Sequence, residues 1–320
     1  MNLPPVHIIV LNYNNFLETE KCIRSLQSVE YPSIQIIVVD NASTDISSQE
    51  LKMKFKDYNF IQSSINRGYA GGMNLGIKYA LSEGACLIML SNNDMIYPPE
   101  FLSPLVNALL KNNNVGIVSP KVLYLNSEKI IYCAGGETKL YRCGGVSMFR
   151  NKDAKNYGNT EREISLAEGS CLLVKKEVFK EVGLLSERFF MYFEDVEFSN
   201  RVIEKFVIKY IPDSVVFHKS GAGKNWTEFS PLYYYYFTRN RLLYYSFHNI
   251  FVRIYVMLFS FLNVISKSFI LLTKFLFQPS VFDQFKKSFM SIWQGFFDGL
   301  KYILGIIKPA DDSPLLRKQD

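Results

Sequence analysis

The sequence predicts an α/β fold with a mainly parallel mixed sheet, followed by a helical C-terminal region. Three apolar runs rich in Val and Ile are typical of buried strands, and each ends in short polar side chains. The runs are Ile8–Leu11 before Asn12-Tyr13-Asn14, Ile36–Val39 before Asp40-Asn41, and Leu87–Leu90 before Ser91-Asn92-Asn93-Asp94. Because ligands of open α/β sheets bind beyond the carboxyl ends of the strands, we expect these polar groups to share one crevice.

Helical patterns separate these strands. Phe16–Leu26 repeats apolar residues at helical spacing, and a turn at Asn41–Asp45 follows the second strand. A strand at Phe60–Gln62 and a glycine-rich loop, Asn66–Gly72, precede a helix over Met73–Leu81. Strands that alternate with helices imply right-handed crossovers and a largely parallel sheet.

The later elements are predicted to be shorter. Polar loops and short strands are expected between residues 116 and 169. After them the sequence predicts a strand at Cys171–Val174, a helix at Lys176–Val182, a helix entered through Phe193–Glu197, and strands at Val207–Ile211 and Val215–Phe217 split by a Pro212-Asp213 turn. His218 follows the last strand, ahead of a flexible stretch at Ser220–Gly223.

Composition excludes several classes of protein. With 320 residues, 48% hydrophobic and 21% charged, the chain is long enough for a sizeable α/β domain plus an appendage and is not a disordered protein. Met1–Pro5 has neither a basic n-region nor a long apolar segment, so we expect no secretory signal and a cytoplasmic enzyme. Five cysteines without C-x-x-C spacing argue against a disulfide framework and a zinc site, so we expect buried thiols.

The C-terminal region, residues 241–320, is both basic and apolar. It carries 10 Lys and Arg against 5 Asp and Glu, which is +5 of the net +6. No nucleic-acid-binding motif accompanies this charge, so an anionic membrane surface is the expected partner, not nucleic acid.

Two helices are predicted in this region. Ile254–Phe277 is interrupted by Lys267 and Lys274, so its charge-free stretch is shorter than the ~20 apolar residues of a membrane span. Residues 285–307 repeat apolar side chains on one helical face and charged ones on the other. We predict two amphipathic helices lying in the interface of the inner face of the cell membrane, with a helical dimer face as the alternative.

Several polar residues near the expected crevice could bind a nucleotide or a metal. Asp40 ends a buried strand and would accept a hydrogen bond from a ligand N–H, unless it caps the next helix. Asn66-Arg67-Gly68 with Gly71-Gly72 would let a loop backbone approach a ligand. Asn92-Asn93-Asp94 offers oxygen ligands for Mg²⁺ or Mn²⁺, with an Asx-turn as the alternative. His218 could complete such a site or serve as a structural hydrogen-bond donor.

An acidic segment later in the chain could supply a general base. Glu194-Asp195-x-Glu197 lies where a loop enters a helix, behind the aromatic-rich residues 189–193. Carboxylates in apolar surroundings have raised pKa values and can accept protons near neutral pH. The alternative is that these acids stabilise the helix by interacting with its dipole.

Taken in order, these segments resemble the family 2 glycosyltransferases, and among them the rhamnosyltransferase-like members of bacterial polysaccharide biosynthesis. The matching pieces are Val10–Asn14, Val38–Asp45, Asn66–Asn74, Asn92–Asp94 and Phe189–Glu197. The resemblance implies a GT-A (nucleotide-diphospho-sugar transferase) fold, a dTDP- or UDP-sugar donor, a divalent metal (Mn²⁺ or Mg²⁺) and inversion at the anomeric carbon. We place the catalytic domain at residues 1–240 and the membrane-associating helical region at residues 241–320.

The resemblance also implies roles for single residues. Asp195 would be the catalytic base, and Asp40 would hold the base of the nucleotide. Asn92 and Asp94 occupy the family's D-x-D motif, and together with His218 they would hold the metal. The residues expected to bind substrate are Asn12, Tyr13, Asn14, Asp40, Asn66, Gly68, Asn92, Asn93, Glu194, Glu197 and Arg239.

Two departures from the family refine the expected reaction. Asn92 replaces the first acid of D-x-D, so metal affinity is expected to be modest. Thr238-Arg239-Asn240-Arg241 stands where processive synthases carry Q-x-x-R-W. We therefore expect a hexosyltransferase that moves one sugar, rhamnose or another hexose, to a glycan or lipid-linked acceptor.

Two alternative functions fit these motifs less well. A noncatalytic glycan-binding scaffold with the same fold would not need the intact Glu194-Asp195 pair. A sugar nucleotidyltransferase usually needs a basic glycine-rich loop near the amino terminus, which this sequence lacks. The donor sugar, the linkage and homo-oligomerisation are left open by the sequence.

Overall fold

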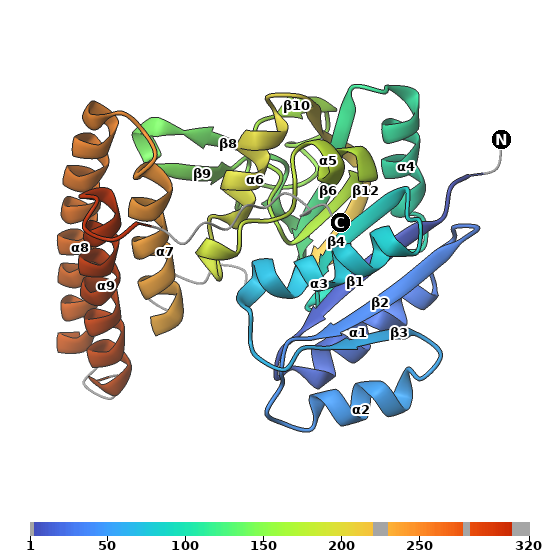
Figure 1. Ribbon diagram of the computed structural model, residues 1–320, viewed down its shortest axis with the longest axis horizontal. Helices are drawn as coiled ribbons and strands as arrows, with labels where there is room; N and C mark the ends of the chain where they lie inside the picture. Colours follow the sequence, from blue (N-terminus) through green and yellow to red (C-terminus); the bar gives the residue numbers. More distant parts are fainter. Residues whose placement is uncertain (1–2, 220–229, 278–281, 309–320) are drawn as a thin grey trace.

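The computed structural model describes residues 3–219, 230–277 and 282–308 of the chain. Figure 1 shows an α/β region with helices on both faces of a sheet and, at its side, a layer of long helices. The stretch Ser220–Gly223 lies outside the described residues, as does the end of the chain beyond residue 308.

The described strands form a ten-stranded sheet and a small two-stranded one. The strands are β1 Val6–Asn12, β2 Ile34–Asp40, β3 Asn59–Gln62, β4 Leu87–Asn92, β5 Met95–Ile96, β6 Val115–Tyr124, β7 Ser127–Cys133, β8 Gly136–Lys139, β9 Gly144–Ser147, β10 Arg162–Ile164, β11 Cys171–Lys175 and β12 Val207–His218. The main sheet has the order β10-β12-β6-β11-β4-β1-β2-β3, with β5 beside β12 and β7 beside β6, and β8 pairs with β9. Strands β3, β2, β1 and β4 are parallel, and β11 runs antiparallel between β4 and β6, so the predicted mixed sheet is confirmed.

Side-chain alternation along the strands builds a core on each face of the sheet. The helices involved are α1 Phe16–Gln27, α2 Ser47–Lys54, α3 Gly68–Ser82, α4 Leu102–Lys111, α5 Lys176–Glu181 and α6 Glu194–Val202. Val6, Ile8 and Val10 of β1 pack with α1, α2 and α4. Ile9 points the other way and packs with α3, α5 and α6. This period of two is what an apolar strand buried on both faces requires.

The prediction of two strands around a Pro212-Asp213 turn is wrong. β12 runs without a break from Val207 to His218, paired with β6 in parallel. The pairing shifts in register between Ile211 and Val215, and this irregularity accommodates Pro212, which has no N–H to donate. The continuous strand matters because it carries His218 to the same edge of the sheet as β5.

The helical layer consists of α7 Pro231–Tyr245, α8 Ile250–Phe277 and α9 Phe282–Ile303, which share a third apolar core. α9 approaches α7 closely, because a Cβ on Gly295 would lie 2.4 Å from the carbonyl oxygen of Tyr235. The predicted boundary between residues 240 and 241 lies inside α7.

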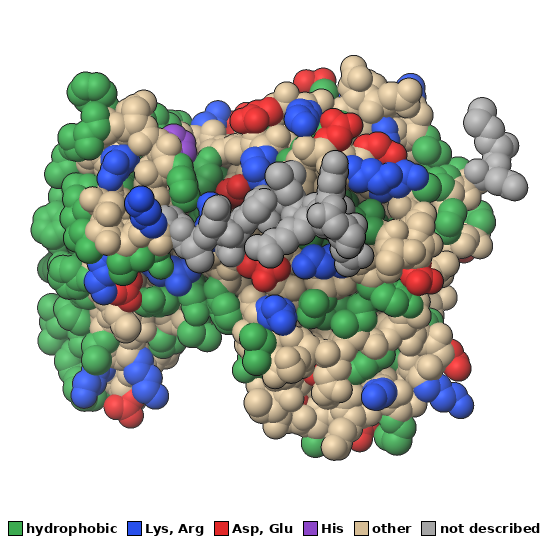
Figure 2. Space-filling model, viewed as in Figure 1, with side chains coloured by type: hydrophobic (Ala, Val, Ile, Leu, Met, Phe, Trp, Pro, Cys, Tyr) green, Lys and Arg blue, Asp and Glu red, His purple; other side chains and the backbone are tan. Residues whose placement is uncertain are grey.

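Much of the surface of α8 is apolar and exposed. Figure 2 shows hydrophobic side chains gathered along the left edge of the molecule, where Figure 1 places this helix. We call this the α8 apolar face; its exposed side chains include Ile254, Leu258, Leu262, Ile265 and Phe269. In the described part of the chain, α8 alone is long and apolar enough to cross a membrane, a test that core helices of soluble proteins also pass.

Candidate active site

The polar ends of the three predicted strands lie at one edge of the sheet, as expected. Asn12 is paired in register with Asp40, and Leu11 is paired with Asn92. β11 begins at the same edge, where the Asn92 N–H donates to the carbonyl of Ser170 (3.0 Å). Residues 168–170 therefore border the crevice, although no site residue was predicted between Asp94 and Glu194.

Asp40 is fully buried and held by three hydrogen bonds. Its Oδ1 accepts from Asn12 Nδ2 (2.8 Å) and Ser43 Oγ (2.6 Å), and its Oδ2 accepts from the Ser43 N–H (3.2 Å). The Asn12 side chain is buried too, and its Oδ1 accepts from Thr19 Oγ1 (2.7 Å). Asn12 thus fixes the position of Asp40. Because its amide oxygen and nitrogen are already hydrogen-bonded, Asn12 has little donor or acceptor capacity left for a ligand.

Tyr13 and Asn14 form the rim of this part of the crevice. Tyr13 is 44% exposed, and Asn14 has a left-handed backbone (φ 50°). The Asn14 N–H donates to Ser43 Oγ (2.9 Å), and Asn14 Oδ1 accepts from the Thr44 N–H (2.7 Å). The exposed Tyr13 ring is therefore displayed on an ordered turn.

The segment from Asn66 to Gly68 is held by Asn41, which is not among the residues predicted to bind substrate. Asn41 Nδ2 donates to Asn66 Oδ1 (3.0 Å) and to the Gly68 carbonyl (2.9 Å). Gly68 has φ +68°, and a Cβ there would lie 2.1 Å from the Phe190 carbonyl oxygen. Gly68 is thus required for close packing against residue 190.

The expectation that Gly71 and Gly72 lie in a ligand-binding loop is wrong. Both belong to α3, which begins at Gly68. A Cβ on Gly72 would lie 2.5 Å from a methyl group of Leu11 in β1. Gly72 thus allows the helix to pack closely on the sheet, whereas a Cβ on Gly71 would lie 2.6 Å from the Cβ of Arg67.

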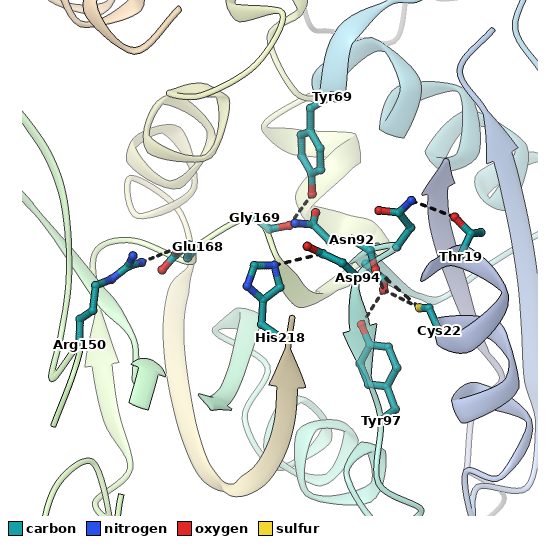
Figure 3. A network of polar contacts seen from close by, with 12 residues as sticks. Thr19, Cys22, Tyr69, Asn92, Asp94, Tyr97, Arg150, Glu168, Gly169 and His218 are labelled. Atoms are coloured by element: carbon teal, nitrogen blue, oxygen red, sulfur yellow. Dashed lines mark hydrogen bonds and ion pairs between the residues drawn. The ribbon is translucent and has the colours of Figure 1, made fainter. Parts of the chain in front are cut away.

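Asp94 and His218 meet at the centre of the crevice (Figure 3). Asp94 Oδ1 lies 3.1 Å from His218 Nε2, and the imidazole packs on the Tyr132 ring at 4.5 Å between centroids. Burial alone raises the pKa of Asp94, but the adjacent His218 and Lys219 outweigh it and lower that pKa below its usual value. Asn93 points elsewhere, because its Nδ2 donates to Thr19 Oγ1 (2.8 Å).

The Asp94–His218 pair has the chemistry of an incomplete metal site. Asp94 Oδ1 and His218 Nε2 contact each other without the geometry of a hydrogen bond, and His218 Nδ1 is buried without a hydrogen-bond partner. A carboxylate oxygen and an imidazole nitrogen suit Mn²⁺, whose remaining ligands could come from water and diphosphate oxygens. No cluster of three or more His, Cys, Asp or Glu suited to a metal occurs among the described residues.

Asp195 lies in the first turn of α6, partly exposed beside the segment 168–170. Its Oδ2 accepts from the Gly169 N–H (3.3 Å) and its Oδ1 from the Val196 N–H (2.8 Å). The Gly169 carbonyl accepts from the Tyr69 hydroxyl, so the segment joins Asp195 to α3 as well as to β4 (Figure 3). Burial, followed by the charge of Glu168, raises the pKa of Asp195 to about 6.

The two neighbouring acids have different environments. Glu194 is buried, its Oε2 has no hydrogen-bond partner, and burial together with the charge of Asp195 raises its pKa well above the usual value. Glu197 forms a two-point ion pair with Arg201 (2.7 and 2.8 Å), which also donates to the Val182 and Leu184 carbonyls. The Glu197 carboxylate thus ties α6 to the segment before Ser186.

Glu168 and Arg150 were missed by sequence reasoning. Arg150 Nη2 lies 3.0 Å from Glu168 Oε1, and its guanidinium stacks over the Tyr132 ring at 4.3 Å. Burial alone raises the pKa of Glu168, but the charge of Arg150 and hydrogen bonds from Cys133, Ser147 and Tyr132 together outweigh it and lower that pKa. Glu168 could have been predicted because it lies three residues before the apolar strand β11, which begins at the edge of the sheet where the other polar groups lie.

The loop before Asp195 has an unusual backbone and depends on Asn240. Phe190, Tyr192 and Phe193 all have positive φ (50°, 68° and 74°), which is costly for bulky side chains. Asn240 is fully buried, and its Nδ2 donates to the carbonyls of Phe189, Met191 and Tyr192 at 2.7 to 2.8 Å. Arg239 supports this arrangement through the Arg188 carbonyl (3.1 Å) and Asn240 Oδ1 (2.8 Å).

Comparison with known proteins identifies the family to which this architecture corresponds. The family model described as glycosyl transferase family 2 matches residues 7–183, more than half of the chain. A low-salt glycan biosynthesis hexosyltransferase of Haloferax volcanii is 31% identical over 202 residues, which cover 62% of each chain. An N-acetylglucosaminyl-diphospho-decaprenol L-rhamnosyltransferase of Mycobacterium tuberculosis is 24% identical over 66% of this chain and 75% of its own. A dTDP-rhamnosyl transferase of Shigella flexneri is 26% identical over 74% and 79%.

Solved structures show the same fold. GalNAc-T7 with UDP, GalNAc and Mn²⁺ superposes with a TM-score of 0.60 at 14% identity, over 77% of this chain and 48% of its own. A mannosyltransferase from Pyrobaculum calidifontis with GDP-Man and Mn²⁺ superposes with a TM-score of 0.54 at 14% identity, over 95% and 88%. The GT-A fold predicted from the sequence is therefore confirmed.

Proposed function

Because this chain belongs to glycosyl transferase family 2, we propose that it moves a single sugar from a nucleotide-diphospho-sugar to a glycan or lipid-linked acceptor in cell-surface polysaccharide biosynthesis. Rhamnose or another hexose is the proposed sugar, because relatives include rhamnosyltransferases and a hexosyltransferase. The observation that carries the proposal is the segment 168–170, which brings Asp195 to the edge of the sheet where Asp94 and His218 meet.

We assign the nucleoside to the region around Asp40, which Asn12 positions, with Tyr13 on the rim. The buried Asp40 carboxylate still has acceptor capacity beyond its three hydrogen bonds, and could accept from a base N–H. Tyr13 is exposed and could stack on the base. We propose dTDP- or UDP-sugars as donors, with Asn66 and Gly68 shaping this end through their contacts with Asn41.

In the proposed reaction Asp195 is the general base. Its carboxylate takes the proton of an acceptor hydroxyl, whose oxygen attacks the anomeric carbon from the side opposite the diphosphate. The bond from that carbon to the diphosphate oxygen breaks, the nucleoside diphosphate leaves with the electron pair, and the configuration inverts. A pKa of about 6 suits this role, because Asp195 is ionised at neutral pH and basic enough to accept a proton.

Asp94 and His218 are the residues that would hold a divalent metal, with Asn92 at the end of β4 beside them. A bound Mn²⁺ or Mg²⁺ would offset negative charge on the departing diphosphate. Asp94 Oδ1 and His218 Nε2, which are buried and lie 3.1 Å apart, are the atoms that would coordinate such an ion. Both superposed structures with bound nucleotide contain Mn²⁺, which supports the same requirement here.

A thermal-shift screen with UDP-, dTDP- and GDP-sugars, each with and without Mn²⁺, tests donor and metal together. We expect one nucleotide to raise the melting temperature, and more so with Mn²⁺, because a ligand that binds only the folded state stabilises it. If no sugar nucleotide stabilises the protein under either condition, the proposed function is wrong.

We further propose that the chain is cytoplasmic and binds the inner face of the membrane through the α8 apolar face. Replacing Leu258 and Leu262, 60% and 64% exposed, by Glu should release the protein from membranes on sedimentation, because charged groups partition poorly into apolar lipid. Leu110→Glu, on the exposed end of α4, is the matched control. Sedimentation of the Leu258/Leu262 double variant with membranes would exclude this face as the membrane contact.

A further inference from the structure

Two cations, Arg241 of α7 and Lys267 of α8, lie beside the same aromatic ring, that of Phe237. Arg241 is 5% exposed, and Lys267 is partly exposed. Within the described residues, neither forms an ion pair with a carboxylate; Arg241 instead donates to the Cys143 carbonyl (3.1 Å) and lies 3.5 Å from Asn263 Oδ1. We call Arg241 and Lys267 the cation pair.

Aromatic rings surround the cation pair. Lys267 Nζ lies 5.7 to 5.9 Å from the ring centroids of Tyr233, Tyr234 and Phe237. The Arg241 guanidinium lies 5.1 Å from Phe237 and 5.3 Å from Phe259. Cation–π contacts offset part of the desolvation of each charge, but they supply no negative charge.

Arg241 departs from the usual rule for buried charges, which are normally matched by an opposite charge, because its charged neighbour is the cation Lys267. Burial, followed by the charge of Arg241, lowers the pKa of Lys267 to about 7, and burial lowers that of Arg241. Two neighbouring cations repel each other, and a bound anion would relieve that repulsion. Groups with perturbed pKa values of this kind often lie at functional sites.

The cation pair is next to the loop that leads to Asp195. The Tyr233 ring contacts the Tyr192 ring (5.2 Å between centroids), and the Phe237 ring contacts the Phe193 ring (5.3 Å). Phe193 directly precedes Glu194 and Asp195. The cation pair is therefore linked, through the rings of Tyr233 and Phe237, to the residues that directly precede the proposed general base.

The two sides of α8 match an amphiphile. Ser260, Asn263 and Lys267 share one arc of this helix, which carries the contact to Arg241, and the Ser260 hydroxyl is buried without a partner. The other side is the α8 apolar face, visible at the left edge of Figure 2. A molecule with a phosphate head and an apolar chain could place the head at the cation pair and the chain along that face.

We propose that Arg241 and Lys267 bind the phosphate group of an amphiphilic lipid, namely the diphosphate of a lipid-linked acceptor whose sugar extends toward Asp195. This inference rests on the proposed function, since it names the acceptor class for the same active site. The other source of the same chemistry is the headgroup of a bulk phospholipid.

Binding of farnesyl diphosphate to the full-length protein tests the proposal. Calorimetry is done in EDTA, so that a divalent metal does not draw the diphosphate to Asp94. We expect Lys267→Met to weaken binding by about tenfold or more, because it removes a charge-assisted contact. Lys267→Arg should bind within about threefold of wild type, and Lys287→Met, on an exposed position of α9, is the control for loss of one charge.

Thermal stability separates an anion site from a purely structural role. Without ligand, Lys267→Met should melt at a higher temperature than wild type, because it removes a partly desolvated charge that is repelled by the charge of Arg241. Farnesyl diphosphate should then raise the melting temperature of wild type but not of Lys267→Met. A lower melting temperature for Lys267→Met together with unchanged farnesyl diphosphate binding would mean that Lys267 only packs against the rings, and would overturn the proposal.

Two further probes identify the source of the phosphate. Phosphatidylglycerol vesicles should bind wild type and Lys267→Met equally, and inorganic diphosphate should bind wild type more weakly than farnesyl diphosphate. Two results would overturn the acceptor assignment. One is that Lys267→Met loses vesicle binding while wild type does not bind farnesyl diphosphate. The other is that wild type binds inorganic diphosphate and farnesyl diphosphate with equal affinity. No sugar nucleotide is needed here, so failure of the donor screen and failure of this test are distinguishable.

Discussion

Asp40 and Asn12 on one side of the crevice differ in construction from Glu194 and Asp195 on the other. Asp40 is fully buried and accepts three hydrogen bonds, and Asn12 is used on both its amide oxygen and its amide nitrogen. Across the crevice, Glu194 has a buried oxygen without a partner, and the pKa values of both acids are raised. The loop that precedes them contains three aromatic residues with positive φ.

This contrast shows on which side of the crevice the energetically unfavourable groups lie. The proposed nucleoside side is a pre-formed and satisfied framework, whereas the proposed acceptor side holds desolvated acids and backbone strain that the surrounding structure must compensate. Active sites commonly keep such groups because a proton acceptor must not be fully satisfied before the substrate arrives. Variants on the two sides should therefore differ in how activity and stability change together.

Asp195→Asn should have the largest effect on transfer. We expect a loss of about 10³-fold in kcat, because general bases typically contribute between about 10² and 10⁴. Donor binding should be unchanged, as measured by calorimetry. Residual turnover above a few per cent of wild type would contradict the assignment, and Asp213→Asn, on an exposed residue of β12, is the matched control.

The same variant should be more stable than wild type, and the gain should depend on pH. The raised pKa of Asp195 favours the folded state at low pH, and this contribution is lost as pH rises from about 4 to about 6. Asp195→Asn should therefore raise the melting temperature at pH 8 and do so much less below about pH 4, where the carboxyl group is protonated in both states. A lower melting temperature at pH 8 would mean that Asp195 is mainly structural.

Asp94→Asn should come next in effect. Removing the carboxylate should weaken Mn²⁺ binding by about tenfold or more and lower kcat/KM by a similar factor. Thermal shift with and without Mn²⁺ measures the first effect, and initial rates over a Mn²⁺ titration measure the second. If the Mn²⁺ response of the variant equals that of wild type, the metal does not bind at Asp94.

Asn240→Ala tests the loop support, at some distance from the chemistry. Removing an amide that serves three carbonyls should lower the free energy of unfolding by about 1–3 kcal/mol, because buried acceptors lose their partner. We expect kcat to fall by roughly tenfold, since small misplacements of a base are costly. Asn107→Ala, on an exposed position of α4, should change neither quantity.

The pH profile should show the smallest effect. Because Asp195 must be ionised to accept a proton, kcat/KM should fall by about tenfold per pH unit below about 6 and be level above 7. Glu168→Gln should move the midpoint to lower pH, because the Glu168 charge helps to raise the pKa of Asp195. An unchanged midpoint in that variant would contradict the proposed coupling.

Much of the fold followed from local patterns. Strands β1, β2 and β4 were predicted from apolar runs, and α1 from its spacing, because buried strands and amphipathic helices have a regular period that a single sequence displays. Gly71 and Gly72 were misplaced because a glycine-rich stretch indicates close approach but not what approaches. In the structure Leu11 lies against Gly72, where a ligand was expected.

Candidate site residues could be predicted where they lie at the ends of strands or helices, but not where they lie inside a helix. Asp40, Asp94 and Asp195 lie at the ends of elements, so their position in the sequence marks them. Asn240 is an ordinary residue inside a helix, and its role arises only because α7 packs beside the loop at 189–192.

The sequence by itself determined the fold class, the crevice at the ends of three strands and the acids that face it, because local periodicity and the carboxyl-end rule of α/β sheets depend on nearby residues alone. The tertiary structure decided which of these groups are free to act. Hydrogen bonding, burial and neighbouring charge are set by segments far apart in the chain. Such contacts satisfy Asp40, leave Glu194 unpartnered, raise the pKa of Asp195 and bring Arg241 and Lys267 together.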